Sequence, residues 1–364
     1  MLNHTKLASI AAVIVTAAAL VSCSAPNGST APASTAPGST APGSAAPTST
    51  AAVSTSSSSA APTSQAKAIK VGIAQIVSHP SLDSIRTGFE TCLTKLGYDA
   101  AYNEQNPQGD QAALTGIAQT FASGHYDLVV AITTPVAQAF AQAITDQPII
   151  FAGVTDPVSA GLATSFEAPG HNLTGTSDYP PIDDQIKLVT DLVPNAKVIG
   201  VVYSSSEVNA EIQLNLAKAA AAKLGLEVKA AAVTNSSEVG QAAASLKGVD
   251  AFYIGNDNTV VSGVEALVQA AQQQKVPVIA ADPDSVTRGA TAAYAIDQTE
   301  MGCQAATLAD KVLKGGNPAT LPVIRMADLK DSLRLTINPT AAAAQGVTIP
   351  ASVSSRPGTV VVGG

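Results

Sequence analysis

One strand-and-helix pattern occurs twice along this chain. Between residues 69 and 282, short apolar runs typical of β-strands alternate with longer amphipathic stretches typical of α-helices. Three landmarks recur in the same order and at a nearly constant offset: TKLGYDA and AKLGLEV, YDLVVAI and VDAFYIG, PIIFAGVTDP and PVIAADP. This repetition indicates two similar lobes. The alternation predicts an α/β fold in which helices cover both faces of parallel sheets.

Each repeat has the predicted order strand, helix ending in Lys-Leu-Gly, strand, helix, strand, helix, strand. The strands are predicted over 69–76, 127–133, 148–154, 197–204, 226–233, 250–256 and 277–282. The helices are predicted over 81–96, 110–123, 135–145, 207–224, 236–246 and 259–274.

The composition supports a two-domain globular body. Of 364 residues, 46% are hydrophobic, which is enough for two cores of ordinary size. The net charge is −8, and no cluster of Lys and Arg is present that would follow a phosphate backbone. We therefore expect no nucleic-acid partner.

The N-terminus has the layout of an export signal. Lys6 precedes an apolar stretch over 7–21, which is short for a membrane-crossing helix of about 20 apolar residues. The following letters, LVSC, resemble the lipobox of bacterial lipoproteins. We predict a lipoprotein signal peptide over 1–22 and a palmitate-type membrane anchor on Cys23. Two alternatives remain: Cys23 is a chance cysteine beside an ordinary cleavage site, or residues 7–21 form an uncleaved anchor helix.

Residues 23–66 are predicted to form a disordered tether rich in Ser, Thr, Ala and Pro. They contain the repeats STAPA, STAPG and STAPG, and no charged or aromatic residue. Such a composition buries too little apolar area to offset the entropy lost on ordering. The tether would hold a folded body away from the membrane.

Small polar side chains follow most of the predicted strands. In open parallel sheets, ligands bind beyond the carboxyl ends of the strands, where helix N-termini and loop side chains converge. A single Ser, Thr, Asp or Asn there is explained by helix capping. The clusters Thr133-Thr134 and Asp257-Asn258-Thr259 contain more polar groups than one cap requires.

This set of side chains suits a small zwitterion. A ligand carboxylate would bind the amides at a helix start near 134–136, and its ammonium would pair with a carboxylate. The candidates for that carboxylate are Asp156, Asp178, Asp257 and Asp282.

Several segments, in order, resemble the bacterial ABC-transporter solute-binding lipoproteins of the tryptophan/tyrosine type. They are VGIAQIVSHPSLDSIRTGFE, VAITTPVAQA, FAGVTDPVSAGL, NLTGTSDYPP, PNAKVIGVVYSSSEVN and GNDNTVVSG. The resemblance spans about 69–350. It implies a type I periplasmic-binding fold, in which two Rossmann-like lobes are joined by hinge segments and close on a ligand.

The resemblance also implies how the chain is divided. Hinge crossings would lie near 175–181, 293–299 and 321–326. The first lobe would comprise 67–178 plus 296–324, the second 179–295 plus 325–350, and a C-terminal tail 351–364. By similarity, the pocket would draw on Gln75, Thr133, Thr134, Thr155, Asp156, Asp178, Asp257, Asn258, Thr259 and Asp282.

No catalytic signature is present. The chain has no G-x-S-x-G, Walker A, G-x-G-x-x-G or H-E-x-x-H motif. We expect no enzyme, no cofactor and no metal site. His79, His125 and His171 are interpreted as loop or packing residues, with His79 near enough to Gln75 in sequence to approach the cleft. Two tyrosines are candidates either for stacking on an aromatic ligand or for core packing, Tyr179 and Tyr203.

Two cysteines remain once Cys23 is assigned. Cys92 lies on the apolar stripe of the first helix, and Cys303 begins a helix that would return to the same lobe. Right-handed crossovers place both helices on one side of the sheet. The sequence leaves two alternatives for these cysteines: a Cys92–Cys303 disulfide or two buried thiols.

We therefore expect an extracytoplasmic receptor, lipid-anchored to the outer face of the cell membrane. It would act as a monomer, capture a small amino acid, an aromatic one by resemblance, and deliver it to an ABC permease. Open alternatives are a sensory receptor coupled to a signalling partner, a binder of another small polar solute, and an extracytoplasmic enzyme. A LacI-like regulator is set aside, because an export signal and tether occupy the place of its DNA-binding helices.

Overall fold

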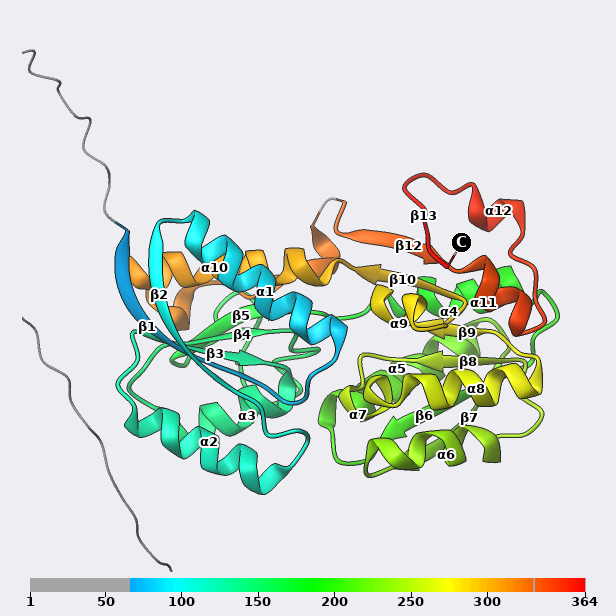
Figure 1. Cartoon of the computed structure of the whole chain (residues 1–364), viewed down its shortest axis with the longest axis horizontal. Coiled ribbons are helices and arrows are strands. Elements are labelled where there is room, and N and C mark those ends of the chain that lie inside the picture. The colour runs from blue at the N-terminus through cyan, green and yellow to red at the C-terminus, as the bar shows by residue number, and fades with distance from the viewer. Residues whose placement is uncertain (1–65, 330, 364) are drawn as a thin grey trace, which may run out of the picture. The chain divides into compact units, whose positions relative to one another are not determined.

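The computed structural model describes residues 66–329 and 331–363. The predicted signal peptide, Cys23 and nearly all of the predicted tether lie outside these residues. Within them, two sheets flanked by helices each form the centre of one lobe (Figure 1).

The first lobe is built on a six-stranded sheet in which every pairing is parallel. Its central strands are buried along their whole length, because helices cover both faces. Across the sheet, the strands are β11 (Ile324–Arg325), β5 (Leu173–Ser177), β4 (Ile149–Ala152), β3 (Leu128–Ile132), β1 (Lys67–Gln75) and β2 (Tyr98–Gln105).

The second lobe is built on a seven-stranded sheet that repeats this order. Counted from its own first strand, the arrangement 2-1-3-4-5 occurs in both sheets, as the internal repeat predicts. Strand β12 pairs antiparallel with β10 and extends the edge. Across the sheet, the strands are β13 (Val360–Val361), β12 (Leu333–Ile337), β10 (Ala292–Ile296), β9 (Val278–Ala280), β8 (Ala251–Ile254), β6 (Val198–Ser204) and β7 (Glu227–Val233).

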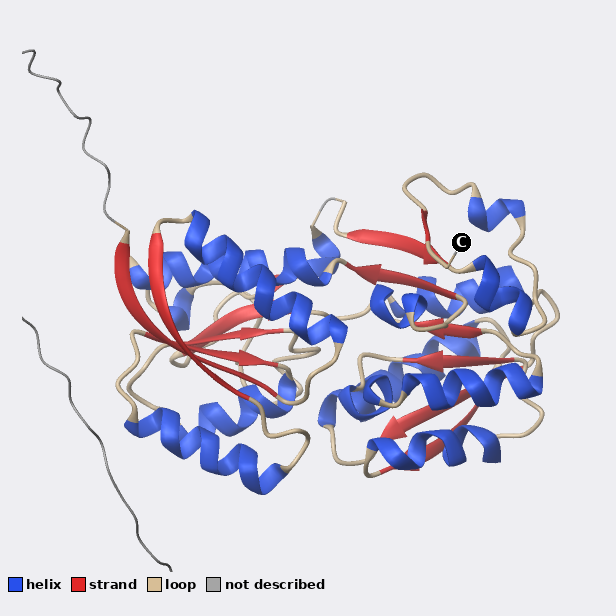
Figure 2. Cartoon of the chain, viewed as in Figure 1, coloured by secondary structure: helices blue, strands red, loops and turns tan. Residues whose placement is uncertain are grey.

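Helices cover both faces of each sheet (Figure 2). In the first lobe, α1 (Pro80–Lys95) and α10 (Gln298–Leu313) pack together, and so do α2 (Gln111–Ser123) and α3 (Thr134–Ala143). In the second lobe, the pairs are α4 (Ile182–Leu192) with α5 (Val208–Lys223), and α6 (Val239–Ser245) with α8 (Val264–Gln274). Shorter helices are α7 (Asn258–Ser262), α9 (Pro283–Thr287), α11 (Pro339–Ala344) and α12 (Ala351–Ser354).

The repeated Lys-Leu-Gly motif ends a helix in both lobes. Gly97 follows α1 with φ +94°, and Gly225 follows α5 with φ +70°. Glycine adopts these conformations without a Cβ penalty, so each residue stops its helix and turns the chain into the next strand.

The structure differs from the predicted elements in several places, and the predicted strand ranges do not include β5, β10, β11 or β12. The predicted helix 259–274 is split into α7 and α8 at Gly263, where a Cβ would lie 2.8 Å from the Ser236 carbonyl oxygen. Strand β2 was not among the predicted ranges, although the repeat order places a strand there; its sequence YDAAYNEQ is largely polar because it lies at the sheet edge. Residues 351–363, expected to be a tail, contribute α12 and β13 to the second lobe.

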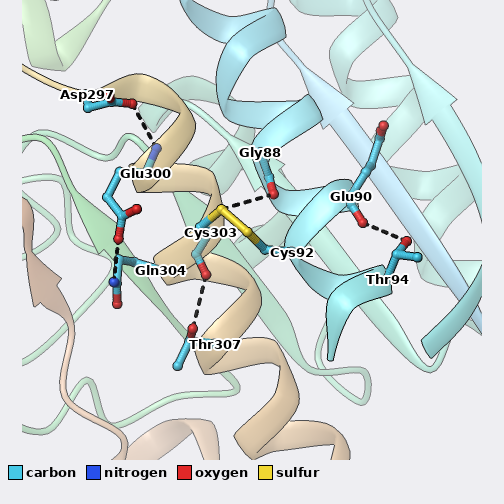
Figure 3. Close-up of a disulfide and its surroundings, with 9 residues drawn as sticks. All are labelled: Gly88, Glu90, Cys92, Thr94, Asp297, Glu300, Cys303, Gln304 and Thr307. Atoms are coloured by element: carbon cyan, nitrogen blue, oxygen red, sulfur yellow. Dashed lines mark hydrogen bonds between the residues drawn. A yellow bond between two sulfur atoms is a disulfide. The ribbon is translucent and has the colours of Figure 1, made fainter. Parts of the chain in front are cut away.

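Helices α1 and α10 touch backbone to backbone. A Cβ on Gly88 would lie 2.3 Å from the Thr299 carbonyl oxygen, and a Cβ on Gly302 would lie 2.0 Å from that of Ile85. Only glycine fits at these two positions. A disulfide joins Cys92 on α1 to Cys303 on α10 at the same contact (Figure 3).

Candidate ligand-binding site

A cavity lies where residues from the carboxyl ends of strands in both sheets come together. It contains about 410 Å³ of space free of protein atoms, solvent at its mouth included. It is lined by His79, Ser81, Leu82, Ile85, Thr133, Gly153, Asp178, Asn209, Asn256, Asp257, Asn258, Val261, Asp282 and Gln298.

Half of the predicted site residues line this cavity, namely Thr133, Asp178, Asp257, Asn258 and Asp282. The structure brings together the ends of β3, β5 and β8 and the start of α9, as the strand-end argument predicts. The set therefore includes residues from both lobes, which lie up to about one repeat apart in sequence.

The other five predicted residues do not line the cavity. The Gln75 amide donates to Asp83 and to the Val77 carbonyl oxygen, and the Thr134 hydroxyl accepts from the Thr155 amide. Thr259 donates to Glu207 and lines a neighbouring groove instead.

Asp156 closes its own turn. One carboxylate oxygen accepts from the backbone amides of Val158 and Ser159, and the other accepts from the Ser159 hydroxyl. The residue therefore acts as a local cap after β4. Capping, rather than ligand binding, explains this strand-end acid.

Three hydrogen bonds connect the two lobes at the cavity. The Ser81 hydroxyl donates to Asp282 at 2.8 Å, and the Asn256 amide donates to Asp178 at 2.6 Å. Deeper in the interface, the Gln213 amide donates to the Thr155 hydroxyl at 3.3 Å. Two of these bonds hold residues that line the cavity, so cavity shape and lobe closure are linked.

Among the three carboxylates of the cavity, Asp178 is the one with an oxygen that has no hydrogen-bond partner in the described chain. Asp257 accepts from the amides of Ser204 and Val260. Asp282 accepts from Ser81 and caps α9 through Ser285. The free atom, Asp178 Oδ1, is the natural partner for a ligand cation.

Burial favours the protonated form of two of these acids. Desolvation raises the pKa of Asp178 to about 6, and the side chains of Thr155 and then Asn256 oppose this more weakly. Burial, together with the nearby Glu207 carboxylate, raises the pKa of Asp257 to about 8. A bound ammonium would stabilise the ionised form of either acid.

Thr133 combines backbone strain with an unused hydroxyl. Its φ of 91° and ψ of 159° lie in a region that is essentially restricted to glycine. Its hydroxyl is buried and makes no hydrogen bond within residues 66–329 and 331–363. Strained residues of this kind cluster at ligand-binding sites, and Thr133 lies at the N-terminus of the ten-residue helix α3.

Several residues that line the cavity were not among the predicted site residues. Asn256 belongs to the GNDNT segment, of which only the three residues that follow Asn256 were predicted site residues. Asn209 lies in the first turn of α5, and Gln298 opens α10. The apolar residues Leu82, Ile85 and Val261 fit an ordinary helix core pattern, so the sequence contains no signal that would assign them to a cavity.

Neither tyrosine proposed for stacking lines the cavity. The Tyr179 ring lies under the Arg325 guanidinium at 4.9 Å, and Arg325 also covers Phe166 at 4.2 Å. Tyr203 packs against the core between the second sheet and α4 and α5.

Comparison with known proteins gives the family. The family model described as ABC transporter substrate binding protein matches residues 70–361. A tyrosine-binding protein of Clostridioides difficile (strain R20291) is 42% identical over 277 residues, 75% of this chain and 79% of that protein. The chain belongs to the ABC transporter substrate-binding protein family. Proteins of this family bind their solute outside the cytoplasm.

Solved structures agree with the fold of this substrate-binding protein. A conserved domain protein from Vibrio cholerae has a TM-score of 0.77 at 38% identity, covering 80% of this chain and 99% of that one. The ABC domain in complex with L-Trp from Streptococcus pneumonia has a TM-score of 0.76 at 37% identity, with the same coverage. Two Rossmann-like lobes of the type I periplasmic-binding fold are thereby confirmed.

The substrate-binding protein is closer to a ligand-bound relative than to an open one. A ligand-free, open structure of a Clostridium difficile substrate-binding protein with adhesive properties has a TM-score of 0.62, at 37% identity and 81% coverage of this chain. The L-Trp complex has the same identity and nearly the same coverage, so sequence similarity does not explain its higher score. Three hydrogen bonds join the lobes directly, so the lobes of this structure are closed on each other.

Two further observations concern the described residues alone. None of their helices combines the length and apolar character needed to cross a membrane. Within the same residues, no group of three or more His, Cys, Asp or Glu side chains is arranged to hold a metal ion.

Proposed function

We propose that this substrate-binding protein captures an aromatic amino acid between its lobes and delivers it to an ABC permease. The single observation that carries the proposal is the pair of buried acceptors Asp178 Oδ1 and Asn209 Oδ1. Both belong to cavity-lining residues and have no hydrogen-bond partner in the described part of the chain. Carboxylate and amide oxygens are acceptors of the kind that an ammonium group requires.

The rest of an amino acid has counterparts in the cavity. The N-terminus of α3, with the unpaired Thr133 hydroxyl beside it, suits the ligand carboxylate. Leu82, Ile85 and Val261 supply an apolar surface for the side chain. The ligands named for two relatives, tyrosine and L-Trp, support an aromatic side chain.

Capture would work through lobe closure. Asp178 lies just after β5 in the first lobe, and Asn209 lies on α5 in the second, so a ligand contacts both acceptors only when the lobes are closed. Binding therefore shifts the hinge equilibrium toward the closed form. The permease would recognise that form.

The proposed location follows from the N-terminal sequence. Diacylation of Cys23 would anchor the protein at the outer face of the cell membrane, and residues 23–66 would act as the tether. The protein would act as a monomer and would not be an enzyme.

A titration of the full chain, purified in detergent, tests the proposal. Calorimetry with the twenty amino acids should detect binding of an aromatic one, and that ligand should raise the melting temperature. Asp178→Asn should weaken binding about a hundredfold, because a buried charged partner of this kind is worth about 3 kcal/mol. Asp183→Asn, which changes an exposed carboxylate on α4, should leave the affinity unchanged.

The same pairing predicts a pH dependence. The pKa of Asp178 is about 6 without ligand, and an ammonium lowers it, so binding releases a proton. Affinity should therefore rise as the pH increases through about 6, and this rise should vanish in Asp178→Asn. Absence of binding by every amino acid, or an Asp178→Asn protein with unchanged affinity and pH profile, would contradict the proposal.

A further inference from the structure

His79 is a buried side chain whose two polar atoms are both unused. It lies at the start of α1, lines the cavity, and is only 7% exposed. Neither ring nitrogen has a hydrogen-bond partner among residues 66–329 and 331–363. Buried polar atoms are nearly always paired, so both nitrogens left without partners beside a cavity indicate a group that arrives with the ligand.

The charged groups around His79 are already engaged elsewhere. Asp282 accepts from Ser81 and Ser285. Asp83 accepts from Gln75 and Ser78, and Arg288 donates to Glu265. These three are the charged groups that act on the imidazole, and none of them forms a hydrogen bond to it.

The imidazole is neutral near pH 7. Burial is the largest effect and lowers the pKa of His79 to about 4; the charge of Asp282 opposes it and that of Arg288 adds to it. A neutral imidazole has one donor and one acceptor nitrogen. Its acceptor nitrogen can therefore pair with an O–H or N–H group of a ligand.

Two apolar side chains of the cavity lie on α1, the helix that begins directly after His79. Leu82 and Ile85 follow it at three-residue spacing on α1 and line the same cavity. Gly153 lies against Ile85, where a Cβ would come within 3.4 Å of the Ile85 Cδ1 atom. The α1 side of the cavity thus combines the apolar side chains of Leu82 and Ile85 with two neutral polar groups at its N-terminal end, His79 and Ser81, and the Ser81 hydroxyl is already bonded to Asp282.

We propose that His79 is a specificity-determining residue, which hydrogen-bonds the O–H or N–H group on the ring of a bound aromatic amino acid. It would thereby favour tyrosine or tryptophan over phenylalanine. This inference rests on the proposed function, and it assigns the side-chain end of the ligand to α1 and the charged end to Asp178 and Asn209.

Calorimetry with tyrosine and phenylalanine, two ligands that differ by one hydroxyl, tests the inference on the full chain. The wild-type protein should bind tyrosine about ten- to a hundredfold more tightly, because phenylalanine leaves the imidazole unpaired. His79→Leu should reduce this ratio to near one, mainly by weakening tyrosine. His79→Gln, which keeps a donor and an acceptor, should restore part of the preference.

The outcomes separate the inference from the proposed function. A wild-type protein that binds both ligands equally overturns the role of His79 while leaving amino-acid capture intact, and this result needs no variant. Equal weakening of both ligands in a folded His79→Leu protein also overturns it, since His79 would then contact the shared amino-acid group. A wild-type protein that binds no amino acid overturns both proposals.

Discussion

Thr133 has a backbone conformation that a β-branched residue rarely adopts. Its φ of 91° and ψ of 159° cost of order 1–3 kcal/mol, and the fold retains them at the exact point where β3 leads into α3. The strain places the buried Thr133 hydroxyl beside the cavity with no protein partner in the described residues. The strain therefore lowers stability at a position where we propose that a ligand contact is made.

Two substitutions at Thr133 separate strain from ligand contact. Thr133→Gly should raise the free energy of unfolding by about 1 kcal/mol, because relief of strain outweighs the entropy cost of glycine. It should also weaken amino-acid binding about tenfold through loss of the hydroxyl. Thr133→Ala should weaken binding similarly while keeping the strain. Urea unfolding and calorimetry measure both effects, and a less stable Thr133→Gly protein would contradict the strain argument.

Helices α1 and α10 are held together as one structural unit by backbone contact and by a disulfide. Gly88 and Gly302 let their backbones meet, and the Cys92–Cys303 disulfide joins them within the same turns (Figure 3). Both helices contribute to the cavity, α1 through Ser81, Leu82 and Ile85 and α10 through Gln298. Close packing therefore fixes one wall of the site.

A pair of glycine substitutions tests this contact. Gly302→Ala should lower the free energy of unfolding by about 2–3 kcal/mol or more, because the new Cβ meets the Ile85 carbonyl at 2.0 Å. Gly116→Ala, at an exposed position of α2 where a Cβ meets nothing within 4 Å, should instead stabilise the protein by up to about 1 kcal/mol. Chemical denaturation checks both values; equal effects would show that the α1–α10 contact has room to relax.

Lobe closure is the main property at the scale of the whole described body. The closed arrangement is held by few polar contacts, and two of them, Ser81 to Asp282 and Asn256 to Asp178, involve residues of the cavity itself. Hinge equilibria of this kind are shifted by small changes in free energy. Loss of one contact should therefore alter the population of open molecules.

Ser81→Ala should make the ligand-free protein more open. Removal of a buried hydrogen bond between the lobes costs about 1 kcal/mol, which changes the ratio of closed to open molecules about fivefold. Small-angle X-ray scattering should show a larger radius of gyration than for the wild-type protein. Ser78→Ala is the matched control, because Ser78 bonds Asp83 within the first lobe. An unchanged radius in Ser81→Ala would argue against this contact as a determinant of closure.

Most of the fold was predictable from local patterns. Apolar runs such as LVVAI and IIFA become central strands because both faces of a parallel sheet are covered. The edge strand β2 lacks that pattern, since an edge strand is only partly buried and its sequence is less constrained.

The sequence alone determined the two-lobed α/β fold and the edge of each sheet where a ligand would bind, because hydrophobic period and strand-end composition are local properties. Only the tertiary structure decided which strand-end acid faces the cavity. Asp156 and Asp178 both follow strands of the first sheet, yet Asp156 caps its own turn while Asp178 meets Asn256 of the other lobe. The sequence allowed His79 to approach the cleft, but only folding buried its ring beside the cavity without a partner in the described chain. Side-chain direction and lobe closure depend on contacts between distant residues, which no local pattern contains.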